Sequence, residues 1–259
     1  MRIAFCLENF NPARGGAEQY VADLSHRLCR HGHHIHVFTL SSNCREEENL
    51  YLHLLKVPPR PRFLKTLSFA IACQRQVARQ GFDIVHSFGR SWGMDIFQPL
   101  GGSQMASLVG NIRSIDSIPA RMIKILSYVF SLRRLTYFLV EGIQMKSART
   151  IVAISAMVKK DLLHYIHLNP ERVKIVRNGV DLQKFHPRNR AIYREEIRQK
   201  LGLREENILI LFVAHNFRLK GLHPLIRALS LLRRDHPERV LFYVRRGYQN
   251  LFLNVEPKW

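Results

Sequence analysis

Two cations and a glycine occupy the most chemically suggestive point of this chain. The apolar run 208–214 (ILILFVA) leads into residues 217–222 (FRLKGL), which contain Arg218, Lys220 and Gly221 and precede a helical pattern. Where a strand delivers cations to the start of a helix, free backbone N–H groups and the positive end of the helix dipole converge with the side-chain charge. The segment predicts a site for a phosphorylated ligand; a solvated basic turn is the alternative.

A second glycine turn lies near the beginning of the chain. Residues 2–7 (RIAFCL) are typical of a buried parallel strand, and Gly15 and Gly16 separate this strand from a helical pattern over residues 20–28. Adjacent glycines let a ligand approach the main chain closely, because neither carries a Cβ. The repeated order of strand, glycine turn and helix predicts two nucleotide-fold-like units, the second beginning near Asn207.

The elements that must position these turns alternate along the chain, which favours a parallel sheet covered by helices on both faces. Beyond the two strands above, we expect strands at residues 35–40, 51–57, 82–86, 95–98, 150–155, 173–177 and 240–244. Helices are expected at residues 64–80, 118–146, 156–165, 191–201 and 223–234. The polar stretch 187–190 (PRNR) predicts a domain boundary, with domains at residues 1–187 and 188–259.

The charge of the chain restricts its partners. Its 259 residues include 40 Lys and Arg against 20 Asp and Glu, a formal net charge of +20. Such a balance attracts nucleic acid, anionic lipid or phosphorylated substrates. The basic residues are spread along the whole sequence, without zinc-finger spacing, an RNP-like aromatic motif or a basic tail, so nucleic acid is not an expected partner.

Part of this positive charge lies in residues 118–146, where apolar residues are interleaved with arginines and lysines. The composition suits a helix lying on an anionic membrane surface, and it equally suits a core helix with solvated basic residues. Neither alternative spans a membrane, since Lys124, Arg133 and Arg134 interrupt the apolar stretch 123–140.

The beginning of the chain and its cysteines predict a compartment. No signal-peptide pattern follows Met1, and the four cysteines are widely separated, at positions 6, 29, 44 and 73. We therefore expect a cytoplasmic protein with reduced thiols, which associates peripherally with the inner membrane face if residues 118–146 lie on lipid.

Four clustered histidines, at positions 31, 33, 34 and 36, raise the possibility of a metal site, since neutral imidazole is a common ligand. In a strand, His34 and His36 share a face while His33 points to the other. No Asp-x-Asp motif, a usual device for holding a metal against a diphosphate, occurs in the sequence. We expect neither a metal nor a cofactor.

Six motifs in a fixed order resemble the GT4-type glycosyltransferases of GT-B fold, in particular their lipopolysaccharide core glucosyltransferase (RfaG-like) branch. They are MRIAFCL at residues 1–7, GGAE at 15–18, GHHIHV at 32–37, VAIS at 152–155, NGVD at 178–181 with Phe185 and Pro187, and FRLKGL at 217–222. The resemblance implies an α/β, GT-B-like chain. Its N-terminal acceptor-binding Rossmann-like domain has a parallel sheet, and a linker and incomplete nucleotide-sugar-binding Rossmann-like domain follow.

The resemblance also implies a reaction. A hexose passes, with retention of configuration, from a nucleotide diphosphate sugar to a lipopolysaccharide-core-like or lipid-linked glycan acceptor, and the nucleotide sugar is a co-substrate. The protein holds the charge of the leaving diphosphate as the glycosidic bond breaks. The residues matching the donor side are Gly15, Gly16, Arg218 and Lys220, and those matching the acceptor side are Glu18, Gly101 and Gly102.

One departure from the family pattern concerns proton transfer. Relatives carry a histidine in a Gln-Pro-His-Gly-Gly turn, or an aspartate nearby, whereas this chain reads QPLGG at residues 98–102. Leu100 cannot take or relay a proton. Asp95, upstream on the same predicted strand, and His86, at the end of the preceding one, are the candidate substitutes.

The second departure concerns the C-terminal part. Relatives hold the donor ribose and sugar with two glutamates separated by seven residues. The only acidic residues after Lys220 in this chain are Asp235, Glu238 and Glu256, which do not have this spacing. We expect a truncated or frameshifted gene product, as a simpler explanation of this difference than a new compact design. The alternative to an active transferase is therefore an inactive remnant that only binds an acidic glycan or an anionic membrane.

Overall fold

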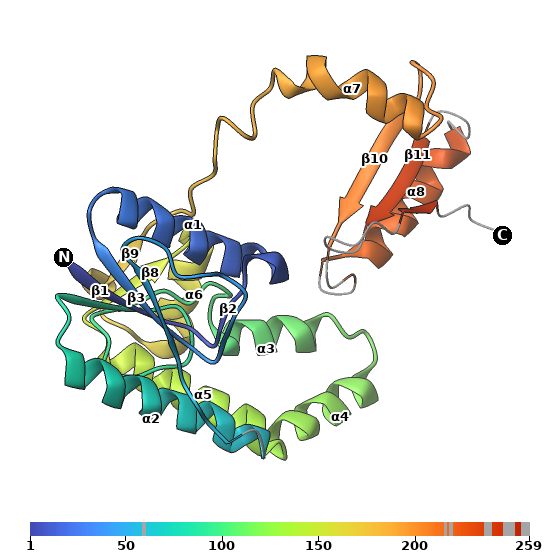
Figure 1. Ribbon diagram of the computed structural model, residues 1–259. Coiled ribbons are helices and arrows are strands. Elements are labelled where there is room, and N and C mark those ends of the chain that lie inside the picture. The colour runs from blue at the N-terminus through green and yellow to red at the C-terminus, as the bar shows by residue number, and fades with distance from the viewer. Residues whose placement is uncertain (59–60, 215–216, 218–219, 236–239, 246–251, 255–259) are drawn as a thin grey trace. The chain divides into compact units, whose positions relative to one another are not determined.

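The computed structural model describes the chain apart from residues 59–60, 215–216, 218–219, 236–239, 246–251 and 255–259 (Figure 1). The chain divides into two compact units, Met1–Gly179 and Val180–Trp259. The expected boundary at residue 187 falls inside the second unit. No helix among the described residues is long and apolar enough to cross a membrane.

A parallel seven-stranded sheet forms the centre of the first unit. Its strands, in spatial order, are β5 (Leu50–Leu54), β3 (His34–Thr39), β1 (Arg2–Cys6), β6 (Ile84–Ser87), β7 (Ile96–Phe97), β8 (Thr150–Ala153) and β9 (Val173–Ile175). The chain builds outwards from β1 to β5 and then returns to β6 on the other side of β1. The sheet therefore reverses its order between β1 and β6, where open α/β sheets bind ligands. A separate parallel pair joins β2 (Asn9–Phe10) to β4 (Ser41–Ser42).

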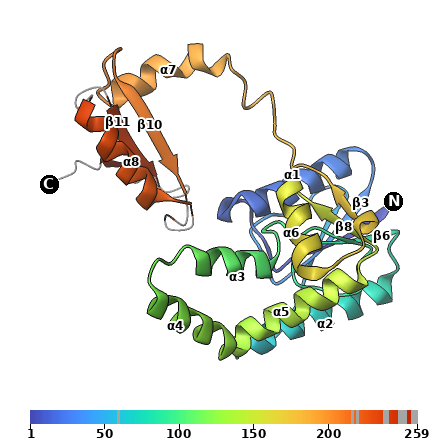
Figure 2. The same cartoon turned by 180° about the vertical axis from the view of Figure 1, so that it is seen from behind.

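Helices cover both faces of this sheet, as Figures 1 and 2 show. The helices of the first unit are α1 (Gly16–Arg30), α2 (Arg62–Gln80), α3 (Gln104–Arg113), α4 (Ile118–Val129), α5 (Leu132–Ser147) and α6 (Ala156–Ile166), with 3₁₀ turns at Pro12–Arg14 and Pro170–Arg172. Helix α4 packs against α3 and α5 and buries none of its residues. Ile3 and Phe5 of β1 belong to the apolar cluster under α1, whereas Ala4 and Cys6 belong to the cluster under α2, α5 and α6. Successive strand residues point to opposite faces, so β1 serves two cores.

The prediction of one helix over residues 118–146 was wrong, because the chain turns a corner there. Helix α4 ends at Val129, Ser131 adopts an extended conformation, and α5 begins at the next residue. Arg134 fastens the corner: its Nη1 donates to Ser127 Oγ at 3.1 Å, and its guanidinium lies 3.5 Å from the centroid of the Tyr128 ring. Helix α3 and the β2–β4 pair were also not predicted.

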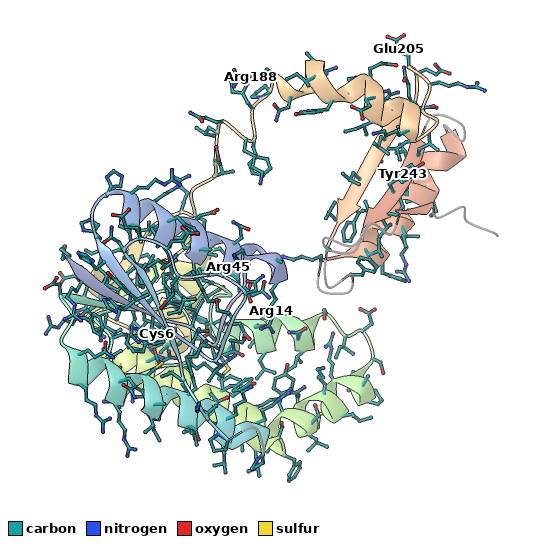
Figure 3. All side chains as sticks on the ribbon, viewed as in Figure 1. Cys6, Arg14, Arg45, Arg188, Glu205 and Tyr243 are labelled. Atoms are coloured by element: carbon teal, nitrogen blue, oxygen red, sulfur yellow. The ribbon has the colours of Figure 1, made fainter. Side chains whose placement is uncertain are left out.

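The second unit is a small α/β element. It contains α7 (Asn189–Lys200), β10 (Ile208–Val213), α8 (Leu222–Asp235), β11 (Val240–Arg245) and β12 (Phe252–Asn254). Strands β10 and β11 are parallel and flank α8 in sequence, and β12 pairs with β11 in the antiparallel direction. Tyr243 of β11, labelled in Figure 3, donates its hydroxyl to the Leu201 carbonyl at 3.3 Å. The predicted order of strand, turn, helix and strand is confirmed here.

Candidate functional site

A cavity of about 260 Å³ opens at the carboxyl edge of the first sheet, where β1 and β6 lie side by side. Its lining comes from residues 7–9 after β1, residues 17–18 of α1, residues 88–90 after β6, Phe97 with the turn that leads from it to Gln104, and Tyr137, Glu141 and Gln144 of α5. This edge coincides with the reversal of strand order, the usual position of a ligand site in such sheets.

Gly89 allows the two central strands to approach at the cavity floor. A Cβ at this position would lie 2.3 Å from Glu8 Oε2, 2.9 Å from Leu7 Cα and 3.2 Å from Glu8 N. The Gly89 N–H also donates to the Cys6 carbonyl at 3.1 Å. Because two of those neighbours are backbone atoms, any larger residue would have to move the main chain that shapes the cavity.

Arg90 brings a positive charge to the cavity, and this charge already has partners within the protein. Its Nη1 lies 3.0 Å from Glu8 Oε1, and its guanidinium carbon lies 3.9 Å from the centroid of the Tyr137 ring. The carboxylate and the aromatic face both stabilise the charge. The arginine therefore joins the β1, β6 and α5 segments of the wall.

Glu141 brings a buried carboxyl group to the same wall. Its residue is 7% exposed, and its Oε1 accepts a hydrogen bond of 2.9 Å from the Gln104 N–H at the start of α3. Burial raises the pKa of Glu141 to about 7, although the Gln104 N–H and the Arg90 charge oppose the rise. The group can therefore hold or release a proton near neutral pH. Neighbouring Gln144 donates Nε2 to the Gly89 carbonyl at 2.6 Å.

The three residues predicted on the acceptor side, Glu18, Gly101 and Gly102, line this cavity. Leu100, which stands where relatives carry a proton-handling group, lines it as well. Gly102 has φ of 72° and donates its N–H to the Pro99 carbonyl at 3.0 Å, so the turn requires the left-handed conformation that glycine adopts easily.

The glycine turn predicted on the donor side immediately precedes α1. Gly15 is extended and Gly16 is the first residue of the helix. A Cβ on Gly15 would lie 3.3 Å from Glu18 Oε2, whereas a Cβ on Gly16 would have no neighbour within 4 Å among the described residues. Glu18 itself lies 3.7 Å from the Nε of Arg14, which Figure 3 labels.

The structure does not bring His86 or Asp95 to the cavity lining. The His86 ring stacks 4.0 Å from Phe88 and meets Phe5 edge-on at 5.6 Å, and burial lowers its pKa to about 4. Asp95 precedes β7 at the opposite edge, where its Oδ2 accepts from the Val85 N–H at 2.9 Å and its Oδ1 lies 3.6 Å from Arg149 Nε. Asp95 lies before β7 and Leu100 lies after it, so the Asp95 side chain is at the other edge of the sheet from the cavity.

The predicted phosphate site is described in part. Arg218 lies outside the described residues, and Lys220 is exposed just before α8. Gly221 has φ of 81°, and its carbonyl accepts from the Leu225 N–H at 3.2 Å as the helix begins. The described residues thus have the strand, glycine turn and helix that the sequence predicted.

The histidines of β3 pack against aromatic rings. His36 Nδ1 lies 2.9 Å from His53 Nε2, and the His36 ring stacks on Tyr51 with centroids 4.6 Å apart. Burial and the nearby His53 lower the pKa of His36 to about 4. Within the described ranges, no group of three or more His, Cys, Asp or Glu side chains is arranged to hold a metal ion.

Gly89, Arg90 and Glu141 were missed by sequence reasoning. Glu141 could have been noticed because it is the only acidic residue in the apolar and basic stretch 132–147. It lies on the side of the helix opposite Leu139. Gly89 and Arg90 lie three and four residues after the predicted strand 82–86, near the strand end where parallel sheets carry ligand-binding residues.

A sequence profile of Glycosyltransferase Family 4 matches residues 14–184, more than half of the 259-residue chain. The chain belongs to this family. The lipopolysaccharide glucosyltransferase WaaG of Escherichia coli is 23% identical over 251 residues, which cover 94% of the chain and 62% of WaaG. Spore coat protein SA of Bacillus subtilis is 33% identical over 103 residues, which cover 38% of the chain and 26% of that protein.

Solved structures show that this family 4 chain has the GT-B fold. A crystal structure of WaaG superimposes with a TM-score of 0.71 at 22% identity, covering 93% of the chain and 62% of WaaG. The complex of Anabaena HepE with UDP-glucose gives a TM-score of 0.56 at 17% identity, covering 96% of the chain and 62% of HepE. The chain spans 26%, 55% and 62% of the lengths of the first three curated relatives it matches.

Proposed function

We propose that this family 4 chain transfers a hexose, with retention of configuration, from a nucleotide diphosphate sugar to a glycan or glycolipid acceptor of the lipopolysaccharide-core type. One observation carries the proposal: a cavity with a proton-holding carboxyl group lies at the β1–β6 reversal point of a GT-B chain. The likeness to WaaG, a lipopolysaccharide glucosyltransferase, and to HepE, solved with UDP-glucose, supports the substrate classes.

The proposed reaction assigns a task to each part of the chain. The acceptor oxygen forms a bond to the anomeric carbon as the bond from that carbon to the diphosphate oxygen breaks, and the electron pair of the broken bond leaves with the diphosphate. The acceptor lies in the cavity, where the Glu141 carboxylate can take the hydroxyl proton in the absence of a suitable group at Leu100. Lys220 and Arg218 stabilise the diphosphate charge, together with the N-terminus of α8. The reaction needs no metal in this proposal.

Calorimetry with a nucleoside diphosphate tests the donor part of the proposal. Lys220→Ala should weaken binding at least about tenfold, because a charge-assisted contact contributes about 1.5–3 kcal/mol. Lys200→Ala is the matched control, since Lys200 already pairs with Glu196 on α7. Equal affinities of Lys220→Ala and the parent protein would contradict the site.

Transfer itself is measured with a labelled nucleotide sugar and a lipid-linked or core-glycan acceptor. Labelled product that disappears in Glu141→Gln supports catalysis. Binding of acceptor without any product would favour the second candidate function, a chain that binds a glycan or membrane and catalyses nothing.

An exposed apolar corner supports association with an anionic membrane surface. Ile123 of α4 is 68% exposed, Phe130 between the two helices 80% and Leu139 of α5 65%. The basic residues Arg121 and Lys124 lie on α4, and Arg133 and Arg134 lie on α5. Exposed apolar groups beside cations suit the boundary between lipid head groups and acyl chains. This surface would bring a glycolipid acceptor to the cavity through α5, which contributes to both.

Vesicle sedimentation tests the membrane proposal. Vesicles containing anionic lipid should retain the protein at low salt and release it as salt rises, because charge attraction is screened within about 10 Å at 0.1 M. Equal retention by neutral and anionic vesicles would contradict the electrostatic contribution.

A further inference from the structure

The charge of the cavity is opposite to the charge of the chain. The protein carries a formal net charge of +20, yet the cavity lining contains three carboxyl groups and, among its described residues, Arg90 as the only arginine or lysine. The carboxyl groups belong to Glu8, Glu18 and Glu141. A site for a phosphate group normally concentrates cations and unpaired N–H groups. The lining of this cavity instead has more carboxyl groups than cations.

The cations near the cavity are already engaged. Arg90 contacts Glu8 at 3.0 Å and stacks on Tyr137, and Arg14, beside the lining, lies 3.7 Å from Glu18. An anionic ligand would have to compete with these carboxylates for the same guanidinium groups. It would also meet the carboxyl group of Glu141, which forms no ion pair with the described residues and feels the Arg90 charge only at longer range.

Glu141 has one oxygen available to a ligand. Its Oε1 is used by the Gln104 N–H, while Oε2 makes no hydrogen bond or ion pair within the described part of the chain. Ionised carboxylate oxygens accept hydrogen bonds and donate none, so their natural ligands are hydroxyl or ammonium groups. The aromatic and apolar neighbours Phe88, Phe97 and Leu100 offer surface to the carbon face of a ring.

We propose that the cavity binds an uncharged, hydroxyl-rich sugar ring, and that the Glu141 carboxylate accepts a hydrogen bond from a hydroxyl of this ring. The inference rests on the proposed function for its substrate class and narrows the acceptor to a sugar that is unphosphorylated where it enters the cavity. Anionic groups elsewhere on the acceptor remain outside, where the net positive charge of the protein lies.

Ligand-observed NMR on the full chain tests this inference without nucleotide and without turnover. The probes are D-glucose, D-galactose and D-mannose, each compared with its 6-phosphate and, for glucose, with D-glucosamine. We expect saturation transfer to at least one neutral sugar and at least tenfold weaker binding of its phosphate. Preferential binding of a phosphate or of the amine, or no binding of any neutral sugar at tens of millimolar, would overturn the inference.

Two variants separate a binding role of Glu141 from a structural role. Glu141→Gln keeps the shape and an oxygen for the Gln104 N–H, and it should weaken neutral-sugar binding about tenfold, since the charged acceptor is lost. Glu171→Gln, at an exposed position, is the matched control and should bind as the parent does. Unchanged sugar affinity in folded Glu141→Gln, verified by circular dichroism, would remove Glu141 from the site.

The pH dependence of sugar binding provides a second readout. Affinity for the neutral sugar should rise as pH increases through about 7, where Glu141 ionises, and this dependence should vanish in Glu141→Gln. The other charged or titratable groups lining the cavity are Glu8, Glu18, Arg90 and Tyr137. A persistent pH dependence in the variant would contradict the assignment.

The inference and the proposed function can fail separately. Because sugar binding is measured directly, loss of transferase activity alone leaves the inference intact. Turnover on a phosphorylated ring would overturn the inference and preserve the proposed function.

Discussion

Helix α5 partly inverts the usual rule for a surface helix. Its buried side carries Glu141, Gln144 and Thr136 beside the apolar Val140 and Met145, whereas its exposed side includes Leu139 and Ile143, which are 65% and 47% exposed. Burying a carboxyl group and exposing large apolar side chains are both unfavourable in an isolated domain. The inversion is understandable if each side meets a ligand: a sugar in the cavity and lipid at the corner.

Helix α1 provides the ordinary case within the same unit. Its buried residues include Val21 and Ala22, and its last turn carries Arg27 and Arg30. Apart from its first turn, which lines the cavity with Ala17 and Glu18, this helix covers the sheet, and its pattern agrees with amphipathic periodicity. The difference shows that departures from this periodicity in α5 coincide with the cavity and the exposed corner.

The largest effect should come from closing the cavity floor. Gly89→Ala places a methyl group 2.9 Å from Leu7 Cα, so the free energy of unfolding should fall by about 3 kcal/mol or more, because backbone must move. Gly101→Ala is the control, since its Cβ would meet no described atom within 4 Å. Denaturant titration of both variants measures the difference. Equal stability of the two would show that the β1–β6 approach can relax.

Removing the buried charge of α5 should increase stability at alkaline pH. Because the pKa of Glu141 rises from 4.5 to about 7 on folding, the native state binds more protons between these values, and its stability falls as pH increases through 7. Glu141→Gln should therefore be the more stable protein at pH 8, by at most about 3 kcal/mol, and the gap should close below pH 4.5.

The lowered pKa values of His86 and His36 act in the opposite direction, costing stability as pH falls from 6.5 through 4 in both proteins. Comparing thermal unfolding of the parent protein and Glu141→Gln across pH 4–8 isolates the carboxyl group. A constant difference over this range would contradict the assigned pKa shift.

Polar substitution on the exposed side should weaken membrane retention and leave the fold intact. Leu139→Ser with Ile143→Ser should reduce vesicle binding by about 2 kcal/mol, because each apolar side chain buried in lipid contributes about 1–2 kcal/mol. Leu54→Ser, at a 62% exposed position on β5, is the control. Retention that is equal in all three proteins would assign the apolar corner to another partner.

Charge reversal at the corner should give an effect no larger than this one, and the effect should depend on salt. Arg133→Glu with Arg134→Glu should weaken retention on anionic vesicles by about 1 kcal/mol per arginine at low salt, and the difference should disappear at high salt. Arg75→Glu with Arg79→Glu on α2 changes the net charge equally. Equal losses in the two double variants would mean that only the total charge matters.

The sequence by itself determined most of the order of strands and helices, the two glycine turns, and the family. These features follow from local periodicity and from backbone requirements such as the positive φ of Gly102 and Gly221, which are written in neighbouring residues. Periodicity could not reveal the corner at Ser131, because apolar residues continue through it and the Arg134 contacts with Ser127 and Tyr128 complete it.

Only the tertiary structure decided which groups share the cavity. Glu8, Arg90 and Glu141 are separated by more than a hundred residues from first to last, and they meet because the sheet reverses its order between β1 and β6. The same packing moved Asp95 to the opposite edge and His86 into the aromatic interior. The pKa of Glu141 depends on burial, and burial is a property of the assembled wall that no local sequence pattern encodes.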